Sequence, residues 1–341
     1  MGLIYAGIDE AGYGPMLGPL CVGLAVFRVE EHAAGANAPD LWEVLKAGVC
    51  RSLKELRTDS KHRVAIADSK ALKLPNQSKT RHPLLHLERA ALSLLAASGV
   101  ECADDTHLFA ALGSVLPDEP WYRGEAAALP LATTAEDLKI ATNVLRSCMK
   151  GAGVELVELR CAVVGETAFN ATIREAGSKA EVVARAVASH VGLIRERWGG
   201  DRLADGDEIR IACDRLGGRA TYTDPLSRAL PGVPITAIAE SPEISGYHLG
   251  PVDGSGSSPV RALFMTESET HHLPVAVASI AAKLVRELAM RRLNRYFGER
   301  LSRELPELKP TAGYVQDARR WLGDVGPHID AETRDRLVRL A

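Results

Sequence analysis

Four acidic side chains stand where predicted strands or helices meet a turn, a position from which a carboxylate can reach a ligand. Asp9 and Glu10 follow the short apolar run 3–8 and come directly before a glycine-rich turn. Asp214 closes the apolar run 209–213, and Glu269 lies shortly before a helix of small residues. Each acid taken alone is also compatible with a carboxylate that caps a turn or faces solvent.

Acids at the ends of three sheet elements suggest one site that gathers carboxylates. Clustered carboxylates repel one another unless cations neutralise them, and their hard oxygen atoms suit Mg²⁺ or Mn²⁺ better than zinc. Two such ions roughly 3.5–4 Å apart support displacement at phosphorus, one by activating a water and the other by stabilising the leaving 3′ oxygen. The residues therefore predict a two-metal phosphodiesterase.

The glycines that follow Asp9 and Glu10 do not form a dinucleotide-binding turn. The run Gly12-Tyr13-Gly14 lacks the Gly-x-Gly-x-x-Gly spacing, and the two acids would lie against a pyrophosphate. The pair His271-His272 is expected at a helix entrance rather than at a metal, because adjacent histidines do not face one centre.

The elements that must position these residues follow an α/β pattern, with a mixed central sheet flanked by helices. Expected strands lie at 3–8, 20–28, 154–164, 209–213, 234–239 and 260–265. Expected helices lie at 40–57, 83–98, 133–150, 180–197, 275–296, 315–323 and 330–340. The first two strands are joined by a short turn and should pair antiparallel. The helix at 133–150 should begin with a capping box, Thr133-x-x-Glu136.

Composition places the chain among ordinary globular proteins and excludes disordered, collagen-like and disulfide-scaffold classes. Its 341 residues are 46% hydrophobic and carry a formal charge of −3, which does not announce a nucleic-acid binder but leaves room for a local basic groove. The six cysteines show no C-x-x-C pair, which favours reduced thiols. Neither a signal peptide nor an apolar run of about 18 residues is present in the sequence, so we expect a cytoplasmic monomer without a membrane span.

Four segments in order resemble the type 2 ribonuclease H family, which comprises ribonucleases HII and HIII. They are 7–15 (GIDEAGYGP, followed by Gly18-Pro19), 67–72 (ADSKAL), 211–214 (IACD) and 269–283, which holds the last acid and a small-residue helix. The pair Gly313-Tyr314 matches the position of the substrate-stacking tyrosine of that family. The resemblance is confined to these segments.

The resemblance implies a ribonuclease H-like fold and an endoribonuclease. Such an enzyme would hydrolyse the RNA strand of RNA–DNA hybrids, or ribonucleotides embedded in duplex DNA, and leave 3′-hydroxyl and 5′-phosphate ends. The resemblance implies that two divalent ions, Mg²⁺ or Mn²⁺, are held by Asp9, Glu10, Asp214 and Glu269. It also implies substrate contacts by Gly12, Tyr13, Gly14, Ser69, Lys70 and Tyr314. In that set the glycine backbone would touch the ribose 2′-hydroxyl, Lys70 would approach a phosphate, and Tyr314 would stack beside the cut.

The chain departs from the family pattern at Tyr13, where ribonuclease HII usually has arginine. The substitution removes a cation directed at phosphate and keeps the glycine backbone. Glu269 in place of aspartate and the pair Phe169-Asn170 are similar to ribonuclease HIII, whereas Gly313-Tyr314 is similar to ribonuclease HII. We therefore expect a divergent member between the two, and the choice between single ribonucleotides and long RNA stretches stays open.

Basic side chains near the second and fourth segments would hold phosphates, so that binding weakens with salt. They are Lys70, Lys73, Lys79, Lys283, Arg286, Arg291, Arg292 and Arg295. A solvated basic helix face is the alternative. Likewise, Trp121-Tyr122 is either an additional nucleic-acid platform or a pair that pins a loop to the core.

We expect a catalytic domain at 1–275, with insertions around 29–60, 113–132 and 241–260, and a helical region at 276–341 that packs on it. Two other functions remain open at this point. The chain could be a non-catalytic nucleic-acid-binding module of the same fold, or a nuclease of this fold with a different structured substrate such as a DNA junction.

Overall fold

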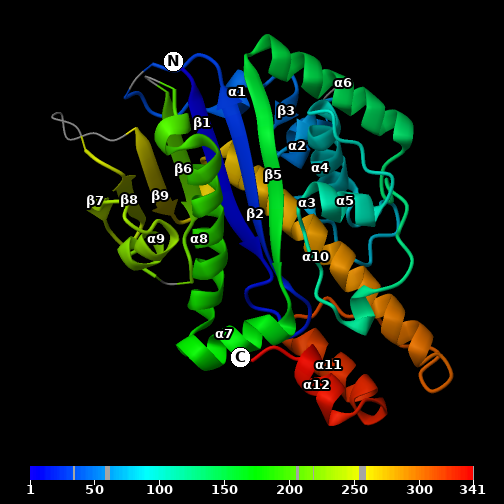
Figure 1. The fold of residues 1–341 in the computed structure, drawn as a ribbon. Coiled ribbons are helices and arrows are strands. Elements are labelled where there is room, and N and C mark those ends of the chain that lie inside the picture. Colours follow the sequence, from blue (N-terminus) through cyan, green and yellow to red (C-terminus); the bar gives the residue numbers. More distant parts are fainter. Residues whose placement is uncertain (34, 58–61, 205–206, 218, 253–258, 341) are drawn as a thin grey trace.

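A mixed seven-stranded sheet forms the centre of the computed structural model, which describes residues 1–33, 35–57, 62–204, 207–217, 219–252 and 259–340 (Figure 1). Within these residues the strand order is β5-β2-β1-β6-β9-β8-β7. The strands are β1 Leu3–Ala11, β2 Leu20–Val29, β5 Val154–Val164, β6 Glu208–Asp214, β7 Ile235–Glu240, β8 Ile244–Leu249 and β9 Val260–Met265. A small separate sheet pairs β3 (Val49–Cys50) with β4 (Val64–Ala65) in parallel.

Strand directions bring the ends of β1 and β6 to the same edge. β1 pairs antiparallel with β2, as the short turn predicts, and parallel with β6. β6 in turn pairs parallel with β9, whereas β5, β8 and β7 join by antiparallel pairs. The predicted α/β fold with a mixed central sheet is therefore confirmed. Because Ile8 lies opposite Cys213, the residues that follow them, Asp9 and Asp214, lie side by side at the carboxyl ends of the strands.

Helices surround this sheet. They are α1 Leu41–Val44, α2 Leu53–Arg57, α3 Ser69–Leu72, α4 Leu85–Ala97, α5 Asp105–Ala111, α6 Ala135–Gly151, α7 Glu166–Ala176, α8 Lys179–Trp198, α9 Thr223–Ala229, α10 Leu273–Arg300, α11 Val315–Val325 and α12 Ala331–Leu337. Short 3₁₀ turns add η1 Pro120–Tyr122, η2 Gly200–Arg202, η3 Ser268–Thr270 and η4 Gly326–His328. None of the helices in the described ranges combines the length and apolar character that crossing a membrane requires.

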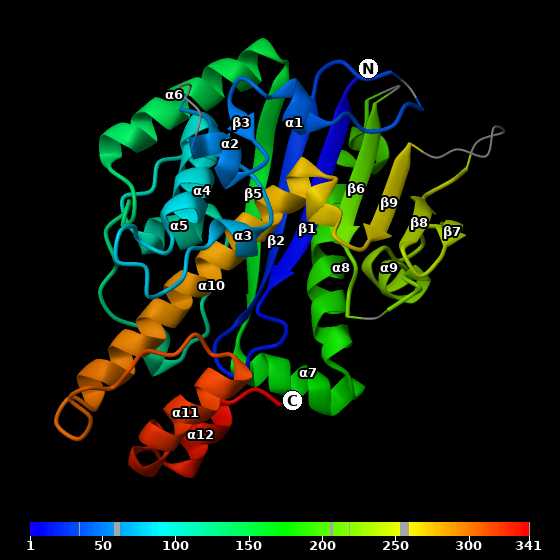
Figure 2. The same cartoon turned by 180° about the vertical axis from the view of Figure 1, so that it is seen from behind.

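The two faces of the sheet are covered differently. α8 lies on the face seen in Figure 1, and α10 crosses the opposite face, against β1 and β2 (Figure 2). α10 can lie directly on the sheet because glycines face it: a Cβ on Gly7 would be 2.1 Å from the Pro274 carbonyl carbon, and one on Gly23 would be 2.0 Å from the Ala278 oxygen. The first part of α10 is therefore buried on nearly all sides, which explains its run of alanines and valines.

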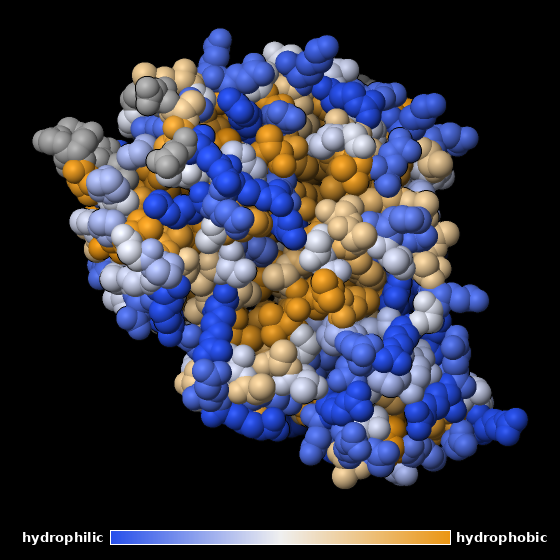
Figure 3. Space-filling view, in the orientation of Figure 1, coloured by the Kyte–Doolittle hydropathy of each residue, from blue (hydrophilic) through white to orange (hydrophobic). Residues whose placement is uncertain are grey.

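The face seen in Figure 1 is not uniformly polar. Hydrophobic residues gather over the lower part of β5, whereas α8 and the α11–α12 region present mainly hydrophilic side chains (Figure 3). β5 is an edge strand, and its last residues Ala162, Val163 and Val164 are only half-buried.

The C-terminal helices form their own core with the second half of α10. Phe297, Trp321 and Trp121 pack there, and Trp121 and Tyr122 are each 2% exposed. Of the two interpretations of Trp121-Tyr122, pinning of the 113–132 segment to the core is therefore right. A nucleic-acid platform is wrong, because neither ring is accessible to a base.

The helix predicted at 40–57 is wrong. The chain forms α1 and α2 with strand β3 between them, because pairing with β4 interrupts the helical pattern. The capping box at Thr133 is also wrong by one position. Thr134 is the N-cap of α6, and its hydroxyl accepts from the Asp137 N–H at 3.1 Å.

Several elements were not predicted, among them α5, α7, α9 and β8. β8 lies inside the predicted insertion 241–260 and belongs to the main sheet, paired with β9 and β7. Residues 253–258 of that insertion, and residues 34 and 58–60 of the insertion at 29–60, lie outside the described residues. No disulfide joins the six cysteines, all of which are described.

Candidate active site

Asp9 and Glu10 lie at the end of β1, and Asp214 is the last residue of β6. Asp9 is 8% exposed, and its Oδ1 accepts a hydrogen bond from the Glu10 N–H at 2.7 Å. The parallel register of β1 and β6 places Asp9 beside Asp214. Two strands that are 200 residues apart in sequence thus deliver three carboxylates to one edge of the sheet.

Glu269 reaches the same edge from the turn after β9. That turn is η3, and it is tied to β6 because the Ser268 N–H donates to Asp214 Oδ1 at 3.3 Å. Glu267, just before η3, has a φ of 54°, which is rare for a residue with a side chain and marks a sharp reversal of the backbone. His272 is the N-cap residue of α10, so the predicted placement of His271-His272 at a helix entrance is confirmed.

Burial raises the pKa values of all four carboxylates, and a neighbouring acid adds to the rise for Asp9, Glu10 and Glu269. Burial and then the Glu10 charge raise the pKa of Asp9 well above its usual range. Burial and then the Asp214 charge raise the pKa of Glu10 to about 7. Burial also raises the pKa of Asp214, and burial together with the Asp214 charge raises that of Glu269. The four carboxylates therefore share one electrostatic environment with too little positive charge.

Lys70 is the cation next to these acids. It lies in α3, whose N-cap Asp68 accepts from the Lys70 N–H at 3.0 Å. Partial burial acts against the Lys70 charge, but nearby carboxylates outweigh it and raise the pKa. These carboxylates are Asp68, Asp9, Glu269 and Asp214.

A serine of α10 connects Asp9 to α3. Ser279 Oγ lies 2.9 Å from Ser69 Oγ, and the Ser279 side chain lies close enough to Asp9 to act against the rise in its pKa. Both serines are buried, at 3% and 4% exposure. The prediction that Ser69 touches substrate is therefore wrong. Its hydroxyl is buried and hydrogen-bonded to Ser279, next to Asp9.

The donor set suits a divalent cation, although it does not form a closed cage. Glu10 Oε2 and Glu269 Oε2 are buried and have no hydrogen-bond partner among the described residues. Buried carboxylate oxygens without partners are costly unless a cation binds them. Among all residues that the structure describes, however, no three His, Cys, Asp or Glu side chains are grouped closely enough to ligate a metal ion as they stand.

The predicted substrate-binding loop follows β1. Gly12 has a φ of 96°, and a Cβ there would lie 2.5 Å from Arg286 Nε, so only glycine fits. The Tyr13 hydroxyl lies against Gly217 in the loop after Asp214, and Gly14 is exposed with open space around it. Tyr13 thus bridges the loops that follow β1 and β6.

Tyr314 lies next to this loop. It is the N-cap residue of α11 and is 49% exposed. The Gly313 carbonyl accepts from the Met16 and Leu17 N–H groups at 2.8 and 3.2 Å, which joins the tyrosine to the loop after β1. Lys283 Nζ and the Arg286 guanidinium lie 5.9 and 5.7 Å from the ring centroid. Two cations therefore lie near the ring, and its exposed part is accessible for stacking.

Four of the eight basic residues expected to hold phosphates have other roles. Arg292 is 8% exposed and donates to both oxygens of Asp105 at 2.9 and 2.6 Å. Arg286 is fully buried, and Lys73 and Lys283 both pair with Glu287. The prediction of phosphate binding is wrong for these residues, because Arg286 and Arg292 lie on the interior side of α10 and Lys73 and Lys283 are already paired with Glu287. Lys70, Lys79 and Arg291 stay accessible.

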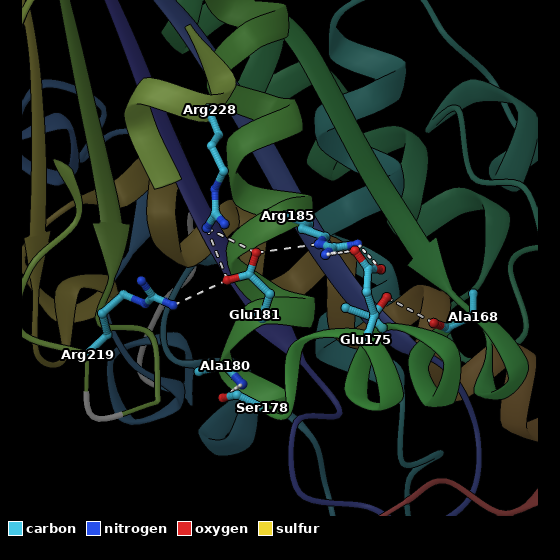
Figure 4. Close-up of polar contacts among 9 residues, drawn as sticks. Ala168, Glu175, Ser178, Ala180, Glu181, Arg185, Arg219 and Arg228 are labelled. Atoms are coloured by element: carbon cyan, nitrogen blue, oxygen red, sulfur yellow. Dashed lines mark hydrogen bonds and ion pairs between the residues drawn. The ribbon is translucent and has the colours of Figure 1, made fainter. Parts of the chain in front are cut away.

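A second carboxylate cluster lies on the face of the sheet that α8 covers. Glu181 of α8 is 7% exposed and pairs with Arg228 at 3.0 Å, Arg219 at 3.4 Å and Arg185 at 3.4 Å (Figure 4). Arg185 also donates to both oxygens of Glu175, at 2.9 and 3.0 Å. In this cluster three arginines converge on Glu181, and Arg185 also neutralises Glu175.

Sequence reasoning missed one residue at the site, Arg339. It lies two positions from the last residue and reaches the loop that follows β1. A lone arginine 327 residues away from Gly12 carries no sequence signal of that contact.

No protein-family model matches the chain, and no curated protein matches its sequence. Its structure is similar to solved structures of ribonucleases HII and HIII, the proteins that its motifs resemble. Ribonuclease HII of Archaeoglobus fulgidus, solved in a complex with PCNA, is 15% identical at a TM-score of 0.41, over 99% of this chain and 94% of that one. Ribonuclease H2 from Pyrococcus horikoshii OT3 is 14% identical at 0.40, over 99% and 92%. Bst-RNase HIII in complex with Mn²⁺ is 15% identical at 0.37, over 99% and 66%.

Proposed function

We propose that this protein is a metal-dependent endoribonuclease that hydrolyses the RNA strand of RNA–DNA hybrids or ribonucleotides embedded in duplex DNA. The observation that carries the proposal is the convergence of Asp9, Glu10, Asp214 and Glu269 at one sheet edge with raised pKa values. Their sequence contexts are also those that resemble type 2 ribonucleases H. A carboxylate cluster with this charge deficit needs cations, and cations at a phosphodiester favour hydrolysis.

The four carboxylates would hold two divalent ions, Mg²⁺ or Mn²⁺. Once bound, such ions would activate water and stabilise the departing 3′ oxygen, which leaves 3′-hydroxyl and 5′-phosphate ends. The oxygens Glu10 Oε2 and Glu269 Oε2 support this assignment, because each is buried and has no hydrogen-bond partner among the residues that the structure describes.

The other side chains of the site would bind and orient the nucleic acid. Lys70 is positively charged and exposed beside the carboxylates, so it suits a phosphate next to the cut. The Tyr314 ring is half-exposed and suits stacking on a sugar or base. The backbone of Gly12, Tyr13 and Gly14 would contact the ribose 2′-hydroxyl, the group that distinguishes RNA from DNA.

The test is cleavage of three matched duplexes by wild type and Asp9→Asn in Mg²⁺ or Mn²⁺. The duplexes are all-DNA, DNA with one ribonucleotide, and an RNA–DNA hybrid, and product ends are mapped. We expect wild type to cut only the two ribonucleotide-containing duplexes, and Asp9→Asn to be inactive with an unchanged circular dichroism spectrum. Glu175→Gln, an exposed acid paired with Arg185, is the matched control and should cut normally.

Cleavage by folded Asp9→Asn at the wild-type rate would overturn the proposal. Cutting of the all-DNA duplex would instead indicate a nuclease for a different structured substrate. Duplex binding with no metal-stimulated turnover would indicate a non-catalytic module.

A further inference from the structure

The C-terminal segment, residues 331–340, returns to the loop that follows β1. Leu17 and Val338 form an antiparallel bridge, and the Arg339 N–H donates to the Met16 carbonyl at 2.9 Å. Asn170 of α7 holds the same segment, because its side chain donates to the Val338 carbonyl at 2.8 Å and accepts from the Leu340 N–H at 2.7 Å. The C-terminal segment is thus held between the loop after β1 and α7.

Arg339 places its guanidinium beneath the loop. Nη1 donates to the Gly12 carbonyl at 2.5 Å, and Nη2 donates to the Tyr13 carbonyl at 3.0 Å. The side chain is 2% exposed and lies 3.7 Å from the centroid of the Phe169 ring. Burial and then the Arg286 charge lower its pKa to about 10, so the guanidinium stays charged at neutral pH. Charged donors at these distances make strong hydrogen bonds.

The two carbonyls that accept from Arg339 fix the direction of two N–H groups. In a trans peptide the C=O and the following N–H point in opposite directions. Because the Gly12 and Tyr13 carbonyls face Arg339, the N–H groups of Tyr13 and Gly14 face away from it, toward the exposed side of the loop. Within the described residues neither N–H donates to a protein acceptor. Gly14 is exposed, with no heavy atom within 4 Å of an added Cβ.

We propose that Arg339 is a positioning residue for substrate: it locks the peptides after Gly12 and Tyr13 so that two successive N–H groups are presented to an oxygen acceptor of the ribose–phosphate backbone. The inference rests on the proposed function for the identity of that acceptor. Successive N–H groups on one side of a loop with a glycine of positive φ form a concave donor site for an anion or hydroxyl. The C-terminal segment is then part of the substrate site rather than a trailing end.

The test compares Arg339→Ala and Arg339→Lys with a matched control on the same segment, Arg336→Ala. Arg336 pairs with Glu119 and touches neither Gly12 nor Tyr13. The readouts are hydrogen exchange of a peptide covering residues 12–18, metal-free binding to a duplex with one ribonucleotide, and the separate KM and kcat values for its cleavage. Thermal melting verifies that each variant is folded at the assay temperature.

We expect Arg339→Ala to exchange faster over residues 12–18 and to raise KM about tenfold with little change in kcat. Arg339→Lys keeps the charge but loses the two-pronged contact, so an intermediate value is expected. Arg336→Ala should match wild type in loop exchange and KM.

Wild-type exchange and KM in Arg339→Ala, or equal effects of Arg339→Ala and Arg336→Ala, would overturn the proposal. If wild type cleaves no duplex, the proposed function is wrong, whatever the result for the Arg339 variants. In that event faster loop exchange together with weaker duplex binding in Arg339→Ala alone still supports the positioning role, and unchanged exchange overturns it.

Discussion

Glu181 and Asp9 are equally buried, at 7% and 8% exposure, but their neighbours are opposite in charge. Three arginines surround Glu181 (Figure 4). Asp9 forms no ion pair in the described part of the chain, and two of its closest electrostatic neighbours, Glu10 and Asp214, are acids. Buried acids are thus neutralised by ion pairs on one face of the sheet, whereas those at the end of β1 lie mainly beside other acids, with Lys70 as the neighbouring cation.

The difference separates a structural carboxylate from one available to a cation. A buried acid that already pairs with arginines gains little from a metal ion, because its oxygens are satisfied. A group of acids that raise one another's pKa values gains charge neutralisation when a divalent ion binds. Burial alone therefore does not mark a site, whereas burial with unmatched charge does.

The largest expected contrast is in catalysis. Asp214→Asn should lower the cleavage rate about a thousandfold, or ~4 kcal/mol in barrier height, because it removes one member of the uncompensated group. Glu181→Gln should keep the rate within about threefold of wild type, provided the assay is run below its melting temperature. Single-turnover kinetics on a duplex with one ribonucleotide measure both. Equal losses in the two variants would mean that unmatched charge does not identify the catalytic acids.

Metal binding should give the next largest contrast. At a Mn²⁺ concentration one hundred times its Kd, wild type should gain about 2.7 kcal/mol of stability, because the ion binds only the folded carboxylate group. Glu181→Gln should keep this gain and Asp9→Asn should lose most of it. Thermal melts with and without chelator measure the change. A gain that survives Asp9→Asn would indicate that the ion binds elsewhere.

The pH dependence of stability without metal tests the carboxylates at the end of β1, through Glu10. The pKa of Glu10 is raised from 4.5 to about 7 in the folded state, so folding binds its proton more tightly. The stabilisation is fully present below pH 4.5 and is lost as the pH rises through about 7. Glu10→Gln should therefore melt roughly 2–4 °C above wild type at pH 8 and close to it at pH 5. Parallel melting curves across this range would contradict the raised pKa.

The smallest effect is expected on the surface side of the Glu181 cluster. The Arg228 side chain is 55% exposed, and two other arginines stay on Glu181 when it is removed. Arg228→Ala should thus cost less than about 1 kcal/mol in the free energy of unfolding, with no change in cleavage. Urea denaturation measures the loss. A cost several times larger would show that Glu181 depends on all three cations.

Local sequence patterns predicted the elements that are long and regular. β5 at 154–164 and the first strand pair follow from runs of apolar residues, and α4, α8 and α10 follow from helical spacing. The missed strands are short ones whose formation depends on pairing. Residues 49–50 are a strand because β4 pairs with them, and β8 exists because β9 and β7 flank it. The residue pattern of such a short segment does not encode its pairing, although the partners lie nearby in the sequence.

The same division applies to the site. Asp9, Glu10, Asp214 and Glu269 were proposed from the sequence because each acid stands at the end of an element within a specific motif. The roles of the basic residues could not be predicted in this way, since a lysine or arginine on a helix looks alike whether the helix is superficial or, like α10, interior. Arg292 and Arg286 are structural only because α10 is buried.

The sequence by itself determined which carboxylates could act together and the strands that carry them, because those features depend on neighbours within a few residues. Only the tertiary structure decided that they share one charge-deficient edge, that Ser279 connects Asp9 to Ser69, and that Arg339 lies beneath the glycine loop. The reason is physical: electrostatic and hydrogen-bond energies depend on distance in space. Strand pairing and the returning C-terminal segment set those distances across hundreds of residues.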